Sequence, residues 1–531
     1  MKLTSTVLFV VVAAGRLAPA FAAENPVVLL KGTGAWTHPI ATANPEAQKF
    51  FDQGLNLAYG FNRAEALRSF KKAAELDPHA AMAYWGMALA QGPYFNMDGD
   101  PSFDLKGACA AVEGGMKIAD APAREEAYLR AVATWCPEFR PSAYSDAMKI
   151  VAQQYPDDLD ALTIYAESLL IATRWHWYKA DGTPAPGVNE AEHILEEVMR
   201  RWPQHPGANH YYIHAVESSR TPERAVASAQ RLMGIVPAEG HMVHMPGHIW
   251  LVLGQWQWAV DVNERAVAAD REYFAKTGMA GGTYEPYYWH NLDFILYART
   301  MQGRREAALN AVDELNRAVA PMASAMPEMA DAFTAVPMLT LARYLEWDRI
   351  LNLPEPAASM QSSRLFRHYV RCLAFAARND QTSAAAEQAE FEKLREQIPA
   401  EAPWGQNKAR DVAALASQIL MARLDKHLVG GVVRWRTAVD MQEHFVYDEP
   451  PAWYYPVRES LGAALLRSGL PEKAEEVFRE GVKRTPHDGW MLFGLMESLK
   501  AQKKLEEAEW VKREFDAAWA GSDVVLRIED L

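Results

Sequence analysis

Apolar residues recur three and four positions apart along almost the whole chain, and runs in which apolar and polar residues alternate are absent. Spacings of three and four place side chains on one face of an α-helix, whereas strict alternation would indicate a half-buried strand. The pattern therefore predicts an all-α protein. At 531 residues, with 50% hydrophobic content, the chain has ample material for a large core.

The helical pattern contains an internal repeat. One segment places small, apolar and proline residues at the spacings of positions 8, 20, 24, 27 and 32 of the tetratricopeptide repeat (TPR): Gly54, Ala66, Phe70, Ala73 and Pro78. Small residues at positions 8 and 20 let two antiparallel helices approach closely, and the proline closes the second helix. Near the C-terminus Ala474 and Ala508 lie 34 residues apart, one repeat length. The predicted fold is an all-α, TPR-like right-handed α-solenoid of antiparallel helix pairs.

The middle of the chain keeps the same period. Ala191, Ala225 and Ala259 are spaced by 34 and 34 residues, and Pro203 and Pro237 each follow the first two alanines by twelve. These residues therefore extend the predicted solenoid through the central region.

Two insertions interrupt this period. Ala307 follows Ala259 after 48 residues, which predicts an insertion of about 14 residues, assigned as a loop to residues 271–286. Residues 179–187, KADGTPAPG, predict a second inserted loop. The predicted organisation is a signal peptide (1–22), an N-terminal extended segment (23–48), helix pairs (49–175), a central histidine-rich region (176–320), further helix pairs (321–520) and a C-terminal tail (521–531).

The first 22 residues have the features of a secretory signal. Lys2 precedes an apolar run over residues 7–14, and in Ala20-Phe21-Ala22 the two alanines supply small residues at the positions that a signal peptidase reads. The run is shorter than the about 20 residues that span a membrane, and no later segment reaches that length. We therefore expect cleavage after Ala22, a periplasmic or secreted protein, and no membrane insertion.

Charge and cysteine content narrow the possible partners. The net charge of −14 becomes −16 once Lys2 and Arg16 leave with the signal, which argues against nucleic acid and favours cationic partners, metal ions included. Cys109, Cys136 and Cys372 form no CxxC motif, so a thiolate zinc site is excluded. One disulfide is possible in an oxidising compartment, with Cys109–Cys136 as one candidate pairing.

Histidines are concentrated in the central repeats, most densely in the stretch EGHMVHMPGHIW (239–250). Counting repeat positions from Ala225, Ala259 and Gly303 places six of them at positions 2, 5 and 9 of three consecutive first helices: His210, His214, His241, His244, His248 and His290. In TPR folds these positions face the concave groove, and neighbouring helices pack about 8–10 Å apart. We expect the six imidazoles to lie on one groove wall, where at least three share an ion.

A single helical histidine is usually a hydrogen-bonded structural residue, but six in groove-facing positions favour a metal site. Histidine ligands suit copper, zinc or iron, and metal binding is expected to weaken below about pH 6.5, where free imidazole is protonated. Positions 5 and 9 repeat on neighbouring helices, so the first-ranked ligands are His210, His214, His244 and His248. Glu217 and Asp293 are the candidate carboxylates, and Glu217 is also the candidate general base.

Pro246 interrupts the densest histidine stretch. Because proline removes a backbone donor, either the helix kinks at Pro246, or it begins there and leaves His241 and His244 on a preceding loop.

Four phrases resemble a group of exported bacterial TPR proteins with a histidine-rich central region: FNRAEALRSFKKAAELDPHAAMAYWGMALAQGPYFN, ANHYYIHAVESS, GHMVHMPGHIW and YYWHNLDFILYA. The resemblance covers most of the mature chain and implies the fold and the histidine site, but no reaction. In that group the first phrase reads FNHAEA and a cysteine follows in DPxCAM. Here Arg63 and Ala80 occupy those places, and the neighbouring His79 replaces the lost groups only in part.

Motifs for common catalytic classes are absent: there is no GxSxG, Walker A, GxGxxG or HExxH. Three functions fit the sequence. The first is a periplasmic metal-dependent enzyme, either an oxidase or oxygenase with copper or iron, or a hydrolase. The second is a metal-binding protein for delivery, storage or sensing. The third is a scaffold that binds a small molecule, a peptide or a protein partner in its concave groove.

Overall fold

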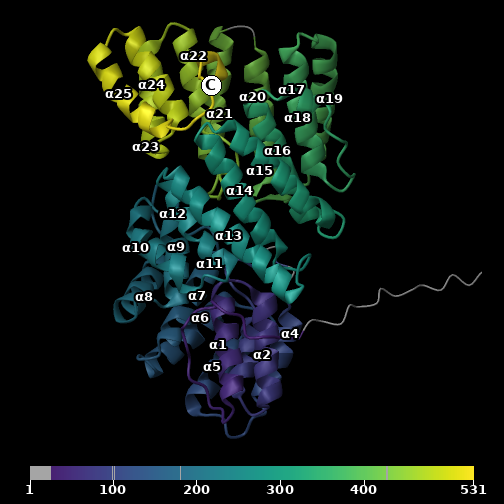
Figure 1. Cartoon of the computed structure of the whole chain (residues 1–531), viewed down its shortest axis with the longest axis vertical. Helices are drawn as coiled ribbons and strands as arrows, with labels where there is room; N and C mark the ends of the chain where they lie inside the picture. Colours follow the sequence, from purple (N-terminus) through teal and green to yellow (C-terminus); the bar gives the residue numbers. More distant parts are fainter. Residues whose placement is uncertain (1–25, 98–99, 101, 180, 426–427) are drawn as a thin grey trace, which may run out of the picture.

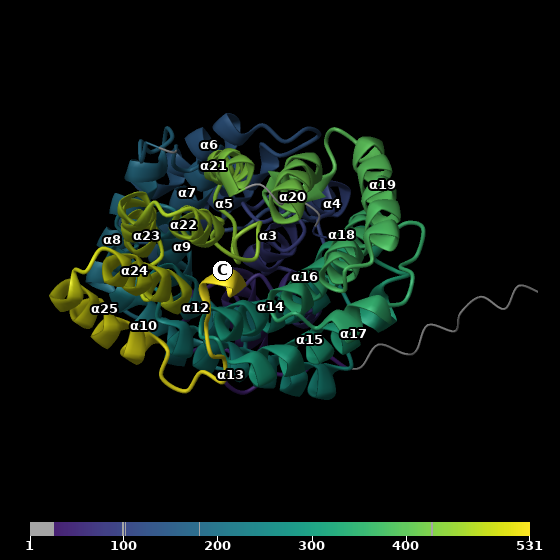
Figure 2. The same ribbon diagram turned by 90° about the horizontal axis from the view of Figure 1, so that it is seen from above.

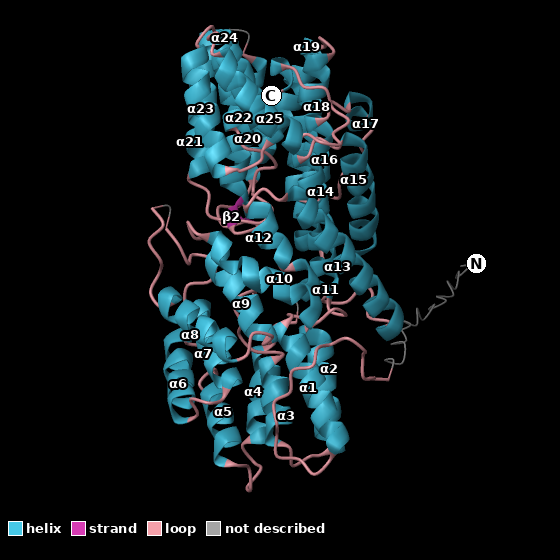
Figure 3. Ribbon diagram, turned by 60° about the vertical axis from the view of Figure 1, so that its left-hand side comes forward, coloured by secondary structure: helices cyan, strands magenta, loops and turns pink. Residues whose placement is uncertain are grey.

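The computed structural model describes residues 26–97, 100, 102–179, 181–425 and 428–531. Helices account for 67% of the chain, compared with about 30–35% in an average globular protein. A hairpin of two-residue strands, β1 (Pro403–Trp404) and β2 (Asn407–Lys408), is also present, and Figure 3 shows how little of the chain is strand. The all-α prediction is confirmed. The predicted signal peptide and its cleavage site lie outside the described residues.

The helices follow one another with short connections. The N-terminal part contains α1 (Pro45–Tyr59), α2 (Arg63–Leu76), α3 (Ala81–Leu89), α4 (Leu105–Gly115), α5 (Ala123–Ala133), α6 (Pro141–Gln154) and α7 (Leu159–Ile171). The central part contains α8 (Val188–Arg201), α9 (Pro206–Glu217), η1 (Pro222–Ala225), α10 (Val226–Ile235), α11 (Gly240–His244), α12 (Pro246–Val252), α13 (Trp256–Thr277), α14 (Glu285–Met301), α15 (Arg305–Val319) and η2 (Ala320–Met322). The C-terminal part contains α16 (Pro327–Arg343), α17 (Trp347–Leu351), α18 (Gln361–Ala377), α19 (Gln381–Gln397), α20 (Ala409–Leu424), α21 (Leu428–Glu443), α22 (Arg458–Arg467), α23 (Pro471–Arg484), α24 (Gly489–Ala501), α25 (Leu505–Ala518) and η3 (Ile528–Asp530).

Neighbouring helices pack as antiparallel pairs, for example α1 on α2, α13 on α14 and α18 on α19. The N-terminal helices lie at one end of the long axis, α9–α13 in the middle and α20–α25 at the other end (Figure 1). Seen from above, the helices surround a central region in which the C-terminus lies (Figure 2). The architecture is a TPR solenoid.

The repeat residues perform the packing roles expected of them. A Cβ atom on Gly54 would lie 2.7 Å from the ring of Phe70, and one on Gly462 would lie 2.4 Å from the ring of Phe478. Since real Cβ contacts are not this short, only glycine lets the two helices of each pair come so close. The prolines also end helices as predicted: α8, for example, ends at Arg201, two residues before Pro203.

The hydrophobic core consists of two clusters. One is built from residues 50–301 and the other from residues 267–531. They meet at α14, which contributes Phe294 to the first cluster and Trp289 to the second. This helix therefore joins the N-terminal and C-terminal cores.

The inserted segments differ in detail from the sequence prediction. Residues 271–277 are helical rather than loop, because α13 meets no helix-breaking residue before Gly278, which caps it with φ +71°. The repeat register after this insertion is also shifted by one: Ala308 is fully buried, whereas Ala307 is half-buried. Residue 179 and residues 181–187, in contrast, are non-helical as predicted, with a bridge between Tyr178 and Pro184.

The candidate disulfide is present. Cys109 and Cys136 are bonded, with their Cα atoms 5.8 Å apart, while Cys372 is a buried free thiol. Among the described helices, none combines the length and the apolar character needed to cross a bilayer.

Candidate metal centre

Four helices bring the six predicted histidines together. Two come from α9, two from α11, one from α12 and one from α14: His210 and His214, His241 and His244, His248, and His290. Ring centroids of neighbours on different helices are 4.8–5.1 Å apart for the pairs His210–His241, His214–His248 and His244–His290. The expectation that repeat positions 2, 5 and 9 converge is therefore met.

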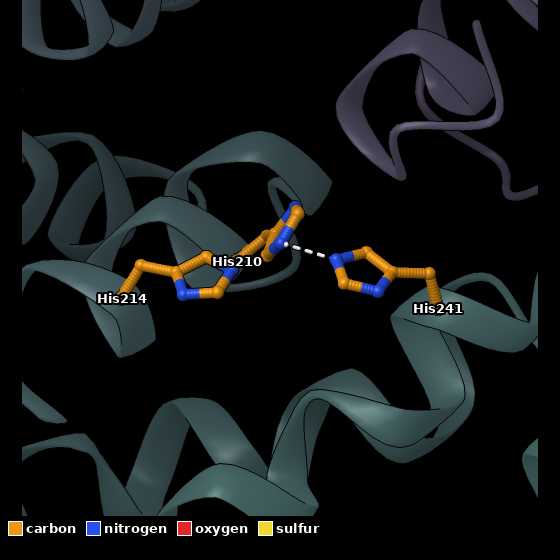
Figure 4. Close-up of side chains that lie close together, drawn as sticks. All are labelled: His210, His214 and His241. Carbon is orange, nitrogen blue, oxygen red and sulfur yellow. Dashed lines mark hydrogen bonds between the residues drawn. The ribbon is translucent and has the colours of Figure 1, made fainter. Parts of the chain in front are cut away.

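The histidines divide into two groups of three. The first triad is His210, His214 and His241, and the second triad is His244, His248 and His290; in each, one ring nitrogen per residue lies within 4.8 Å of the others. Nε2 of His210 is 3.2 Å from Nε2 of His241 (Figure 4). Two imidazole nitrogens on one tetrahedral ion would be about 3.3 Å apart, given metal–nitrogen distances of about 2.0–2.1 Å. His210 and His241 are thus spaced as two ligands of one ion would be, and His214 lies within 4.8 Å of both.

Pro246 separates two short helices, α11 and α12, that follow each other directly. Met245, between α11 and α12, keeps helical angles of φ −49° and ψ −38°, and its amide donates to the carbonyl of His241 at 3.0 Å. Proline is tolerated here because it is the first residue of α12, where no amide donor is required. A helix therefore does begin at Pro246, as the second alternative predicts, but His241 and His244 lie on the short helix α11 and not on a loop.

Fixed acceptors hold the Nδ1 atoms of His210 and His244. The backbone carbonyl of Tyr59 accepts from His210, and Oδ1 of Asn263 lies 2.6 Å from Nδ1 of His244. The amide of Asn263 is oriented by its own donation to the carbonyl of Ala259 at 2.7 Å. A carbonyl oxygen can only accept, so both histidines carry their proton on Nδ1 and present the Nε2 lone pair.

Glu217 performs the same role for two histidines at once. Its Oε1 is 2.8 Å from Nδ1 of His214, and its Oε2 is 2.5 Å from Nδ1 of His248. Carboxylates that accept a hydrogen bond from a ligating histidine orient the ring and increase its basicity. The structure therefore makes Glu217 a positioning residue for the two rings, with both of its oxygens occupied, rather than a free general base.

The Nε2 atoms of His244 and His248 are the most informative pair. They are 2.7 Å apart, and both residues direct Nδ1 to an acceptor. When Glu217 is ionised, both Nε2 atoms carry a lone pair, and these repel each other at this distance unless a proton or a metal cation lies between them. Nε2 of His214 is also buried, and among the described residues it has no hydrogen-bond partner. The site thus presents several unshared lone pairs in the protein interior.

Burial sets the electrostatics of the cluster. It lowers the pKa of all six histidines, that of His210 to about 3 and that of His290 to about 4. The imidazoles are therefore neutral near pH 7, the form that binds metal. Burial also raises the pKa values of Glu217 and Glu449 well above their ordinary value. A bound cation would oppose that shift, because it stabilises the carboxylate form.

The site is enclosed, which corrects the prediction of an open groove wall. Five of the six histidines are at most 2% exposed, and only His290 is partly exposed. Aromatic rings from other elements cover them: the Phe95 ring lies 5.3 Å from that of His214, and the Tyr287 ring 4.7 Å from that of His241. The solenoid winds tightly enough for its own segments to fill the concave side here.

Sequence reasoning missed three partners of the cluster. Glu449, on the segment between α21 and α22, places Oε1 3.5 Å from Nδ1 of His248, and no repeat pattern marks that segment. The Tyr59 contact uses a backbone carbonyl, which no side-chain pattern can reveal. Asn263 had a signal: it occupies repeat position 24, where Phe70 and Phe478 pack in other repeats.

Several other candidates lie outside the two triads. Asp293 is buried, and burial, together with the charge of Asp448, raises its pKa to about 7, but it belongs to neither triad. His79 is exposed and does not replace the missing group. Arg63 is buried, donates to the carbonyls of Leu89 and Gly92, and lies over the Tyr94 ring at 3.9 Å. The positions that hold histidine and cysteine in similar sequences thus contribute packing here.

A separate polar cluster contains His38, Asp158 and Asp160. The carboxylate of Asp160 already contacts four groups: the side chains of Trp36, His38, Tyr59 and His205. Through these contacts Asp160 anchors the N-terminal segment to α7, while Oδ2 of Asp158 is buried and has no hydrogen-bond partner among the described residues.

Comparisons with known proteins yield fold likeness alone. No family model matches the chain, and no curated protein matches it. Among solved structures, yeast Tom70 is 10% identical over 89% of this chain and 90% of that chain, with a TM-score of 0.29. The human IFIT1 dimer with m7Gppp-AAAA is 11% identical over 90% and 91%, with a TM-score of 0.32. Cut9 in its complex with Hcn1 is 13% identical over 85% and 76%, with a TM-score of 0.30. Sequence identities and TM-scores this low give no information about function.

Proposed function

We propose that this protein binds a transition-metal ion through its buried histidine cluster. The observation that carries the proposal is the pair of Nε2 atoms of His244 and His248, 2.7 Å apart, with Nδ1 of each ring held by an acceptor. Imidazole ligands suit copper, zinc and iron, and affinity for nitrogen sites rises toward copper. The arrangement is therefore best explained as a metal site.

The proposed compartment is the periplasm. The N-terminal sequence has the features of a secretory signal, and the disulfide between Cys109 and Cys136 is stable in an oxidising compartment. A metal-binding protein in that location acts as an enzyme or as a carrier. A three-histidine site favours the enzyme, because it leaves a fourth coordination position for a substrate or water.

The histidine cluster does not support the hypothesis that the protein is a scaffold for a peptide partner. Since five of the six rings are at most 2% exposed, a peptide in the groove could contact His290 alone among them. A protein partner would have to bind elsewhere on the solenoid, where the TPR fold offers extended surfaces.

Metal analysis of the mature protein, purified without a nickel column, tests the proposal. We expect at least about one transition-metal ion per chain by mass spectrometry of the dissolved sample, because a buried site with preformed ligands loses metal slowly. After removal of the metal, the midpoint of thermal unfolding should fall, since a ligand that binds only the folded state stabilises it. Less than about a tenth of an ion per chain, also after incubation with copper and zinc, contradicts the proposal.

The pH dependence follows from the lowered pKa values. A histidine whose folded pKa lies below its unfolded value near 6.5 contributes stability above pH 6.5 and loses it as the pH falls through the folded value. For His210 and His290 the folded values are about 3 and about 4. We therefore expect metal content, measured after dialysis, to stay constant from pH 8 to pH 6 and to fall toward pH 4. Half-loss at pH 6.5, the expectation for exposed imidazoles, would show that the ligands are not buried.

A further inference from the structure

We infer that the histidine cluster is a two-ion centre, with one ion in each triad and Glu217 as a carboxylate shared by both. This inference rests on the proposed function, since it requires that the cluster bind metal. It goes further in assigning the number of ions, the division of ligands between them and the residue that couples the two positions.

The first argument is that the triads are complete and separate. His210, His214 and His241 form one set, the other three histidines form the second, and no residue belongs to both. Each set offers three nitrogens, which is the ligand number of catalytic three-histidine sites. A single ion with about four coordination positions, the usual number for histidine-bound copper or zinc, would leave at least two of the six nitrogens unused.

The second argument is the position of Glu217. One oxygen contacts His214 of the first triad at 2.8 Å, and the other contacts His248 of the second triad at 2.5 Å. The rings of these two histidines are 5.1 Å apart. One carboxylate thus orients one ligand in each triad, which is the arrangement expected when two metal positions are built as a unit.

The third argument is charge balance. Six neutral imidazoles add no charge, and the carboxylates in contact with them are those of Glu217 and Glu449. Two Cu(I) ions bring two positive charges, which these two carboxylates neutralise. Two divalent ions would leave two positive charges uncompensated in an aromatic, enclosed site, where unpaired charge is unfavourable. The geometry and charge together point to a dicopper(I) centre.

A different arrangement with a single ion would use the Nδ1 atoms of His214 and His248 in place of their Nε2 atoms. His214, Glu217, His248 and Glu449 also lie within coordinating reach of one another. However, the 2.5 Å contact between Nδ1 of His248 and Glu217 has the length of a strong hydrogen bond, and an ion there would replace both hydrogen bonds of Glu217. This arrangement would also leave the Nε2 atoms of both triads without a metal ion to bind.

Copper stoichiometry separates these arrangements. The mature protein is loaded anaerobically with Cu(I) and then equilibrated with a chelator of known affinity. Two ions per chain support the inference; one ion overturns it but leaves the proposed function standing; no bound ion overturns both. After oxidation to Cu(II), two neighbouring ions should also give a half-field signal in the electron paramagnetic resonance spectrum.

Variants then assign the ions to the triads. His210→Ala with His241→Ala, and separately His244→Ala with His290→Ala, should each leave one ion and abolish the half-field signal. Loss of all copper from either variant, with helical circular dichroism unchanged, would show that the triads are not separate sites. Retention of both ions in either variant would equally overturn the assignment.

Glu217→Gln tests the shared carboxylate. An amide has one acceptor oxygen, so it can hold only one of the two histidines, and we expect the copper affinity of the other position to fall by about 10–100-fold. The matched control is Glu223→Gln, on the exposed η1 segment, which should change neither affinity nor stoichiometry. Unchanged affinity in Glu217→Gln, or complete loss of copper in Glu449→Gln, would instead favour another ligand set.

Discussion

Replacing His214 and His248 together by alanine is expected to lower metal affinity by more than about 100-fold. The pair removes one ligand from each triad, so the effect does not depend on whether one or two ions bind. It also removes both hydrogen-bond donors to Glu217. Since loss of an outer hydrogen bond alone costs about 10–100-fold in affinity, loss of the ligands themselves should cost more.

The measurement is a chelator competition with copper or zinc, followed by metal analysis of the protein fraction. A control with the same number of histidines removed is available: His193 and His444 are both exposed and lie outside the triads. His193→Ala with His444→Ala should keep the full metal content. If both double variants bind metal equally well, the buried cluster is not the metal site.

The second large effect concerns the stability of the C-terminal core. Nη2 of Arg343 is 2.6 Å from Oε2 of Glu459, both side chains are at most 3% exposed, and the guanidinium lies 3.9 Å from the Trp490 ring centroid. Arg343→Met should lower the free energy of unfolding by about 3–5 kcal/mol, because it leaves Glu459 buried without its cation. Burial already raises the pKa of Glu459 to about 8 with the arginine in place.

Denaturant unfolding followed by circular dichroism measures this loss. The double change Arg343→Met with Glu459→Met should recover most of the stability, because an apolar pair leaves no unpaired charge. An exposed pair provides the comparison: Arg200 and Glu197 are 71% and 44% exposed, so Arg200→Met should cost less than about 1 kcal/mol. A loss below about 1 kcal/mol in Arg343→Met would contradict the account of the buried pair.

Much of the fold was predictable because the repeat pattern is local. Residues three and four apart share a helix face regardless of the rest of the chain, so the small residues Gly54 and Gly462 and the helix-ending prolines could be read from their spacing. The one-residue shift from Ala307 to Ala308 shows the limit of this reasoning. An insertion breaks the period, and only packing then decides which alanine faces the partner helix.

The sequence by itself determined that the protein is a TPR solenoid and that six histidines converge, since the repeat register assigns each one to a helix face. Tertiary structure decided how they are divided. The two triads depend on how α9, α11, α12 and α14 cross, and on the break between α11 and α12 at Met245. It also decided that the site is enclosed and that Glu449 reaches it from the C-terminal part of the chain. Such contacts join residues far apart in sequence, so no local spacing encodes them; they exist only once the winding of the solenoid brings distant segments together.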